Sequence, residues 1–308
     1  ASKTARDRAR QERGVTRPQM LFPHSAHPAF AKACSYLDIE PVQIPLRDDY
    51  RANADAAANL ITDQTVMIAG SAPCYPFGVI DPIEDLAALA SERDINFHTD
   101  SCLGGFVLPF FEKLGLDIPP FDFRVPGVTT ISADVHKYGY CTKGASVIAH
   151  RTHQSLHEYQ LFKYSDWPGG GYASFAMAGA RPAAPIAAAW AVLHYLGEEG
   201  YLRLAQVLLE TTQRLREGIA AIPGLQIIGD PEMTLFAFGS TPDHDLDIFA
   251  VGDAMDERGW CLDRQQNPNA LHLMVSPEHA RVVDAFLLDL QEAAKTRAPS
   301  KDTEARYS

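Results

Sequence analysis

The first half of the chain alternates short apolar runs with longer stretches of helical composition. The apolar runs have the length and composition of strands and lie at residues 19–22, 40–46, 65–69, 95–98, 128–133 and 145–149. The helical stretches lie among them, at residues 3–13, 28–37, 53–61 and 82–93. Such alternation is typical of βαβ units, so we predict an α/β fold whose mostly parallel sheet is flanked by helices.

The pattern changes after a passage rich in glycine and proline at residues 167–172. Two long helices are predicted at 183–196 and 199–221, followed by strands at 225–228, 235–238 and 271–275 and helices at 246–258 and 277–294. We therefore expect a large domain over 1–182, connecting helices over 183–221 and a smaller C-terminal α+β domain with an antiparallel sheet over 222–295. The polar tail at 296–308 is expected to be disordered.

Composition narrows the function classes. The 308 residues include 46% apolar side chains, which suits a soluble globular protein, and the net charge of −12 argues against nucleic-acid binding. Five cysteines without a CxxC pair suit a reducing compartment, so a cytoplasmic protein with free thiols is expected. No apolar run is long enough to cross a bilayer.

Two polar segments directly follow predicted strands and carry the candidate chemistry. Asp100 follows the run at 95–98, and Lys137 lies in a turn rich in glycine and tyrosine after the run at 128–133. Pyridoxal phosphate chemistry needs a lysine that bonds to the cofactor aldehyde and a carboxylate that keeps the ring nitrogen protonated. Each residue alone fits a surface lysine or a capping aspartate, but together they favour the cofactor. Because ligands bind beyond the carboxyl ends of parallel strands, His27 and Tyr75 are expected at the same edge of the sheet.

Other motifs lack the residues that their chemistry requires. No GxSxG sequence is present, and the glycines at 139 and 144 have P-loop spacing without the P-loop lysine. Three histidines at 150, 153 and 157 have no acidic or cysteine partner, so we expect no metal site there. The glycines at 169–171 fit either a phosphate-binding loop or a hinge between domains.

Four strings resemble the sphingosine-1-phosphate lyases, within the fold-type I pyridoxal phosphate enzymes that include the group II amino-acid decarboxylases. They lie at residues 23–30, 70–78, 98–106 and 132–146, and the similarity extends from residue 3 to about residue 294. The string around Tyr75 and the spacing from Lys137 to Lys143 distinguish the lyases from the decarboxylases.

The resemblance implies roles for individual residues. Lys137 matches the Schiff-base lysine, Asp100 the partner of the ring nitrogen, and His27 the histidine that stacks on the ring. His136 either reaches the cofactor phosphate or packs beneath the sheet. Tyr75 and Lys143 match the positions for acid–base catalysis. The simpler interpretation of Tyr75 is a packing aromatic, and that of Lys143 is a solvent-facing turn residue.

The implied reaction is cleavage of a phosphorylated long-chain amino alcohol into a fatty aldehyde and phosphoethanolamine. Alternatives are an amino-acid decarboxylase, or a non-catalytic truncated scaffold of the same fold. The family's phosphate-binding Gly-Gly-Thr-Glu-Ser-like turn is expected to precede the first helix, so we expect this chain to lack an N-terminal segment. The resemblance also implies a homodimer with a shared active site.

Overall fold

A computed structural model describes residues 1–244, 246–296, 299–301 and 304–305. Its contacts divide the chain into two compact units, which are described separately. The first unit contains residues 1–74, 80–109 and 118–197, and the second contains residues 75–79, 110–117 and the chain from Glu198 onward.

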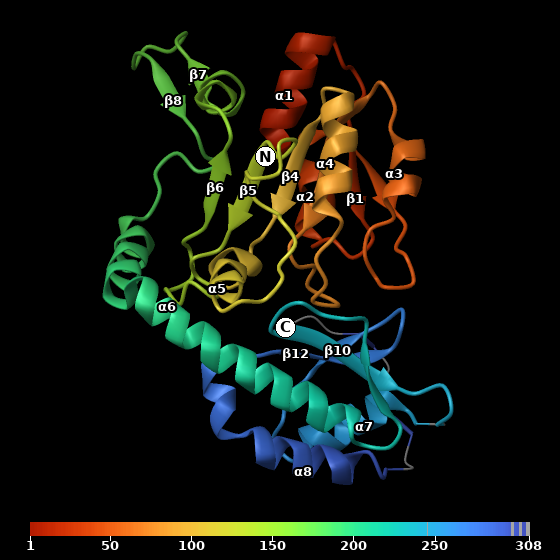
Figure 1. Ribbon diagram of the computed structural model, residues 1–308. Coiled ribbons are helices and arrows are strands. Elements are labelled where there is room, and N and C mark those ends of the chain that lie inside the picture. Colours follow the sequence, from red (N-terminus) through yellow and green to blue (C-terminus); the bar gives the residue numbers. More distant parts are fainter. Residues whose placement is uncertain (245, 297–298, 302–303, 306–308) are drawn as a thin grey trace. The chain divides into compact units, whose positions relative to one another are not determined.

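The first unit is built on a six-stranded sheet with the order β2-β1-β3-β4-β5-β6 (Figure 1). The strands are β1 (Gln19–Pro23), β2 (Glu40–Ile44), β3 (Thr65–Ser71), β4 (Asn96–Asp100), β5 (Thr130–Ala133) and β6 (Val147–His150). The first five strands are parallel, and β6 runs antiparallel to β5. The predicted mostly parallel sheet is confirmed.

Helices flank this sheet, and the first four were predicted from the sequence. They are α1 (Ser2–Arg13), α2 (Ala29–Leu37), α3 (Ala54–Leu60), α4 (Ile83–Glu92), the 3₁₀ turn η1 (Gly104–Phe106) and α5 (Leu108–Lys113). Helix α4 packs on β3 and β4. Its buried residues recur with helical spacing, so one face enters the core: Ile83, Leu86, Ala87 and Ala90. Strand β3 is buried along its whole length, as a central parallel strand should be.

A small hairpin follows the sheet in the first unit. A π-helical turn, η2 (Ser155–Gln160), leads into β7 (Phe162–Tyr164), which pairs antiparallel with β8 (Tyr172–Ser174). The glycines at 169–171 form the tip of this hairpin, where the Gly170 amide donates to the carbonyl of Trp167 at 2.9 Å. The interpretation of these glycines as an interdomain hinge is therefore wrong.

The second unit contains the antiparallel sheet that the sequence predicted. Its strands have the order β11-β12-β10-β9, with bounds β9 (Leu225–Ile228), β10 (Leu235–Ser240), β11 (Asp263–Gln265) and β12 (Ala270–Met274). Helix α7 (Ile248–Asp256) packs on β12 and on α8 (Val283–Ala293), which the short turn η3 (Pro277–Arg281) precedes. Residues 75–79 join this unit because Gly78 lies against the β10 backbone, where a Cβ would stand 1.9 Å from the Leu235 carbonyl oxygen.

Helix α6 (Ala183–Ala220) consists of two helical stretches that meet at a kink at Gly197, in agreement with the two helices expected at 183–196 and 199–221. Gly197 interrupts it with φ 56°, and the division between the two units falls at this residue. The expected domain boundaries at 182, 221 and 295 stay predictions. The expected disordered tail falls largely on residues outside the described part of the chain. Among the described residues of this tail, the Ser300 amide donates to the Asp247 carboxylate and the Lys301 amide donates to the Asp253 carboxylate.

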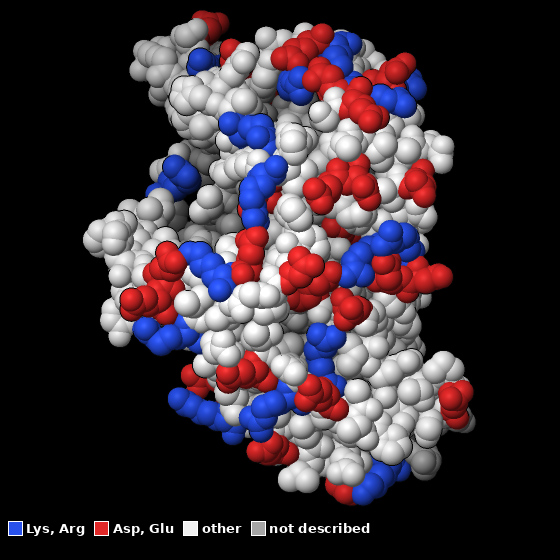
Figure 2. Space-filling model, in the orientation of Figure 1, with Lys and Arg blue, Asp and Glu red and all other residues white. Residues whose placement is uncertain are grey.

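Charged side chains of both signs are interspersed on the face of the molecule that Figure 2 shows. Among the residues that the structure describes, no helix has the combination of length and apolar character needed to cross a membrane.

Candidate active site

Lys137 lies in a tight turn between β5 and β6. The Lys137 amide donates to the Asp134 carbonyl at 3.1 Å, and the Tyr140 amide donates to the Lys137 carbonyl at 3.0 Å. Gly139 is required for this turn, because a Cβ there would stand 2.4 Å from the carbonyl oxygen of Val135. The antiparallel pairing of the two strands therefore fixes both ends of the lysine loop.

Asp100 is the last residue of β4, and its register partner on β5 is Ser132. Its side chain is buried, with 9% of the residue exposed. Its Oδ1 atom accepts from the Ser132 hydroxyl at 2.9 Å and from the Cys102 amide at 3.1 Å. These two donors hold the carboxylate in one orientation at the carboxyl edge of the sheet.

A cavity of about 330 Å³ brings three of the predicted residues together. Its lining includes His27 from the turn after β1, Asp100 from the end of β4 and Lys137 from the turn after β5. All three elements belong to the first unit. The edge of the sheet thus places an amine, a carboxylate and an imidazole around one space.

His27 is half-buried, and its ring orientation is set locally. The Ala29 amide donates to Nδ1 at 3.1 Å, so Nε2 carries the proton of the neutral ring. Burial lowers the pKa of His27, and Lys137 lowers it further, whereas Asp100 and Asp134 oppose the shift. At neutral pH the imidazole is therefore uncharged and suited to lie against an aromatic ring.

The Lys137 amine lies within hydrogen-bond distance of Asp134 and of Cys102. Nζ lies 3.1 Å from the Asp134 carboxylate and donates to Cys102 Sγ at 3.1 Å. Burial acts to lower the pKa of Lys137, but these two side chains outweigh it and the net pKa is raised. Burial, with a contribution from Asp100, raises the pKa of Cys102 to about 12, so this residue is a neutral thiol at physiological pH.

The remaining predicted residues lie outside the lining of this cavity. His136 Nδ1 donates to the Ala145 carbonyl at 2.7 Å, and Nε2 lies 3.7 Å from the Asp134 carboxylate, so the ring packs within the lysine loop. Lys143 is exposed on the same loop. Tyr75 belongs to the second unit, where its hydroxyl donates to Asp263 at 2.6 Å and its ring lies 4.3 Å from that of His272.

Four residues of this cavity and its surroundings were not singled out from the sequence: His98, Cys102, Ser132 and Asp134. His98 lies two residues before Asp100 on the same face of β4 and is fully buried, and burial lowers its pKa to about 3. Because side chains two positions apart in a strand point to the same face, the sequence could have identified His98 as a neighbour of Asp100. The partners of Ser132 and Cys102 come from the register of β4 and β5, which the sequence does not specify.

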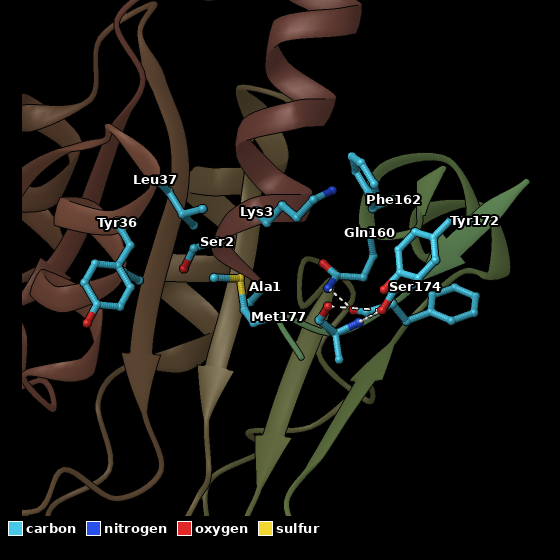
Figure 3. A pocket seen from close by; sticks show the side chains of 13 residues that line it. Ala1, Ser2, Lys3, Tyr36, Leu37, Gln160, Phe162, Tyr172, Ser174 and Met177 are labelled. Carbon is cyan, nitrogen blue, oxygen red and sulfur yellow. Dashed lines mark hydrogen bonds between the residues drawn. The ribbon is translucent and has the colours of Figure 1, made fainter. Parts of the chain in front are cut away.

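A second cavity of about 570 Å³ lies beside the first and shares Ala1, Ser2 and Ala33 with it. Tyr36 and Leu37 of α2 line one side, and the hairpin of β7 and β8 lines the other (Figure 3). Its lining is largely apolar and includes five large side chains besides Tyr36: Leu37, Phe162, Tyr172, Phe175 and Met177.

The first cavity fits pyridoxal phosphate. A buried carboxylate whose Oδ1 is already held, an amine on a neighbouring loop and a neutral imidazole are the protein groups that this cofactor requires. The strand order and the lysine loop define the class of fold-type I pyridoxal phosphate enzymes.

Comparison with known proteins agrees with that class. Residues 2–240 match the family described as pyridoxal-dependent decarboxylase conserved domain, and the chain belongs to this family. The chain is 48% identical to the sphingosine-1-phosphate lyase of Arabidopsis thaliana over 296 residues, which cover 96% of the chain and 54% of that relative.

Solved structures extend the comparison. The sphingosine-1-phosphate lyase of Burkholderia pseudomallei superposes with a TM-score of 0.91 at 44% identity, covering 95% of this chain and 66% of that one. Glutamate decarboxylase of Lactobacillus brevis shares the fold with a TM-score of 0.83 at 22% identity, covering 96% of this chain and 72% of that one. The chain spans about half the length of the curated relatives that it matches.

Proposed function

We propose that the protein is a pyridoxal phosphate-dependent carbon–carbon lyase. It cleaves a phosphorylated long-chain amino alcohol to a fatty aldehyde and phosphoethanolamine. The observation that carries this proposal is the convergence of His27, Asp100 and Lys137 on one cavity. Relatives named sphingosine-1-phosphate lyase, 48% and 45% identical over 96% of the chain, support the choice of reaction.

Three residues of the first cavity and His136 of the lysine loop have proposed tasks. Lys137 attaches the cofactor through Nζ, Asp100 accepts a hydrogen bond from the cofactor's ring nitrogen, and His27 covers one face of the ring. When bound, pyridoxal phosphate withdraws the electron pair that remains on the carbon beside the substrate nitrogen after a bond breaks. His136 keeps the lysine loop in shape through its hydrogen bond to the Ala145 carbonyl.

Tyr75 and Lys143 are proposed for proton transfer at the substrate hydroxyl. Cleavage of the bond between Cα and Cβ requires a group that removes the hydroxyl proton. The hydrogen bond from the Tyr75 hydroxyl to Asp263 fixes the direction of the phenol, and the exposure of Lys143 leaves its amine accessible.

The second cavity supports a substrate with a long hydrocarbon chain. It is apolar, it adjoins the cofactor cavity, and its volume of about 570 Å³ exceeds what the side chain of an amino acid needs. We propose that the alkyl chain of the substrate lies there, because burial of methylene groups in such a space is favourable by about 0.8 kcal/mol each.

We also propose that the protein is a cytoplasmic homodimer. The five free cysteines suit a reducing compartment. Helix α6 exposes apolar side chains at helical spacing, Ile186, Trp190 and Leu193, which suits a face that a second subunit covers. Light scattering of the natural protein should give the dimer mass, and a monomer at working concentration would refute this part.

Attachment of the cofactor is tested on the natural protein that contains this chain. Borohydride reduction in the presence of pyridoxal phosphate, followed by peptide mapping, should place the pyridoxyl group on Lys137. The Lys137→Ala variant should lose the label and Lys143→Ala should keep it. A label on Lys143 would reverse the two lysine assignments, and no absorbance change with the cofactor would favour a non-catalytic scaffold.

The reaction is tested by supplying sphingosine-1-phosphate and a panel of amino acids in parallel, while aldehyde and carbon dioxide are measured separately. Aldehyde from the lipid with no carbon dioxide from the amino acids is the expected result. Carbon dioxide without aldehyde would identify the protein as a decarboxylase.

A further inference from the structure

The carboxylate of Asp134 is at the centre of a small polar cluster in the lysine loop. Its Oδ1 accepts from the Ser146 hydroxyl at 2.6 Å, while Oδ2 lies 3.1 Å from Lys137 Nζ and 3.7 Å from His136 Nε2. The Asp134 side chain is 17% exposed and that of Lys137 is 25% exposed. A largely buried carboxylate therefore faces the amine that the proposed function assigns to the cofactor.

In the described part of the chain, the ion pair that Lys137 forms is with Asp134, and the other titratable groups around the amine include Cys102, His27 and Asp100. Cys102 donates or accepts only as a neutral thiol, because burial raises its pKa to about 12. His27 is held neutral by burial, which lowers its pKa. Asp100 is a second carboxylate in the lining of the cavity, where its Oδ1 accepts from the Ser132 hydroxyl and from the Cys102 amide. Among the described residues, Asp134 is thus the anion in direct contact with Nζ.

We propose that Asp134 is a positioning residue that holds the Lys137 amine as an ammonium at the rim of the cavity whenever the amine is not bonded to the cofactor. This inference rests on the proposed function for the identity of the lysine. The geometry serves that purpose because Ser146 fixes one carboxylate oxygen and leaves the other directed at Nζ. A released lysine kept charged cannot attack the cofactor again until it loses a proton.

The test measures how the reactivity of single lysines depends on pH in the cofactor-free natural protein. Trace acetic anhydride is added between pH 7 and 10, and mass spectrometry of peptides gives the acetylation rate of each lysine. Below the pKa the rate follows the fraction of neutral amine, which rises tenfold for each unit by which the pKa falls. If the ion pair raises the pKa of Lys137 by one unit, acetic anhydride should acetylate Lys137 about tenfold faster in the Asp134→Asn variant than in the wild type at pH 8.

Three comparisons separate positioning from a merely structural role. Lys143, exposed on the same loop, is the internal reference, and its rate should not change. Ser146→Ala retains the Asp134 charge and should raise the Lys137 rate less than Asp134→Asn does. Asp134→Glu restores a carboxylate and should return the rate toward that of the wild type.

Identical Lys137 profiles in the wild type and Asp134→Asn would overturn the inference, as would a rise for Lys143 equal to that for Lys137. If Asp134→Asn does not fold, the other two variants decide. The inference would be overturned if the Lys137 acetylation rate matches the wild type in Ser146→Ala and differs from the wild type by tenfold in Asp134→Glu. Failure of this inference is distinguishable from failure of the proposed function, because the proposed function fails if borohydride labels no residue, whereas a label on Lys143 would reverse the two lysine assignments.

Discussion

The hydrogen bond from Ser132 to Asp100 provides a sharp test of the cofactor site. Ser132→Ala removes one of the two donors to Oδ1, at 2.9 Å, and leaves the Cys102 amide at 3.1 Å. A hydrogen bond to a charged group contributes about 1.5–3 kcal/mol. Because this bond forms with or without cofactor, most of that amount should appear as a lower free energy of unfolding.

Cofactor affinity should fall by a smaller amount. Without Ser132 the carboxylate must be oriented when the cofactor binds, and ordering one side chain costs about 0.5–1.5 kcal/mol. The dissociation constant of pyridoxal phosphate should therefore rise about two- to tenfold. Titration of the cofactor-free protein by absorbance measures the affinity, and urea unfolding measures the stability.

Ser101→Ala is the matched control for Ser132→Ala. The Ser101 hydroxyl donates to the Ser132 carbonyl at 2.7 Å, so its loss removes a neutral hydrogen bond in the same strand pair without touching the carboxylate. Stability should fall by about 0.5–1.5 kcal/mol with unchanged affinity. Equal losses of affinity in both variants, or none in Ser132→Ala, would refute the role given to this contact.

Three further predictions concern other parts of the molecule. Gly139→Ala should lower the melting temperature and slow cofactor attachment, because overpacking costs about 1–3 kcal/mol. The control Gly171→Ala should match the wild type, because a Cβ at Gly171 would meet open space. Burial lowers the pKa of His272 to about 4 from 6.5, so the unfolded chain takes up the proton first as pH falls. The free energy of unfolding should drop between pH 6.5 and 4 by up to about 1.4 kcal/mol per pH unit for this histidine, and urea midpoints of His272→Gln should show a shallower dependence. Tyr75→Phe should slow turnover and leave borohydride labelling of Lys137 intact. Asp263→Asn, which retains the shape of the carboxylate, should also slow turnover. Unchanged turnover rates in both variants would exclude Tyr75 from proton transfer.

The sheet could be predicted from the sequence because of its periodicity, and the family could be predicted because four motif strings resemble it. Continuous apolar runs such as that of β3 are typical of buried parallel strands, and the polar segments after β4 and β5 identified Asp100 and Lys137. The antiparallel direction of β6 was not predicted, because a short apolar run does not encode the direction of its pairing.

The supporting contacts were out of reach for a related reason. Ser132 meets Asp100 through strand register, and Asp134 meets Lys137 through the turn that Gly139 permits. The division of the chain is equally non-local, since Gly78 packs against Leu235 more than 150 positions away in the numbering. Propensity and motif describe neighbours in sequence, whereas these contacts depend on the completed fold.

The antiparallel pairing of β5 with β6 has a consequence for local unfolding. β6 is an edge strand, and Ala133 pairs with Val147 at the two ends of the lysine loop. The loop therefore belongs to the same cooperative opening unit as this edge of the sheet. Fraying of the edge would release the tether on both ends of the loop at once. Amide exchange in β6 and loss of bound cofactor should then respond together to mild denaturant, before the central strands open.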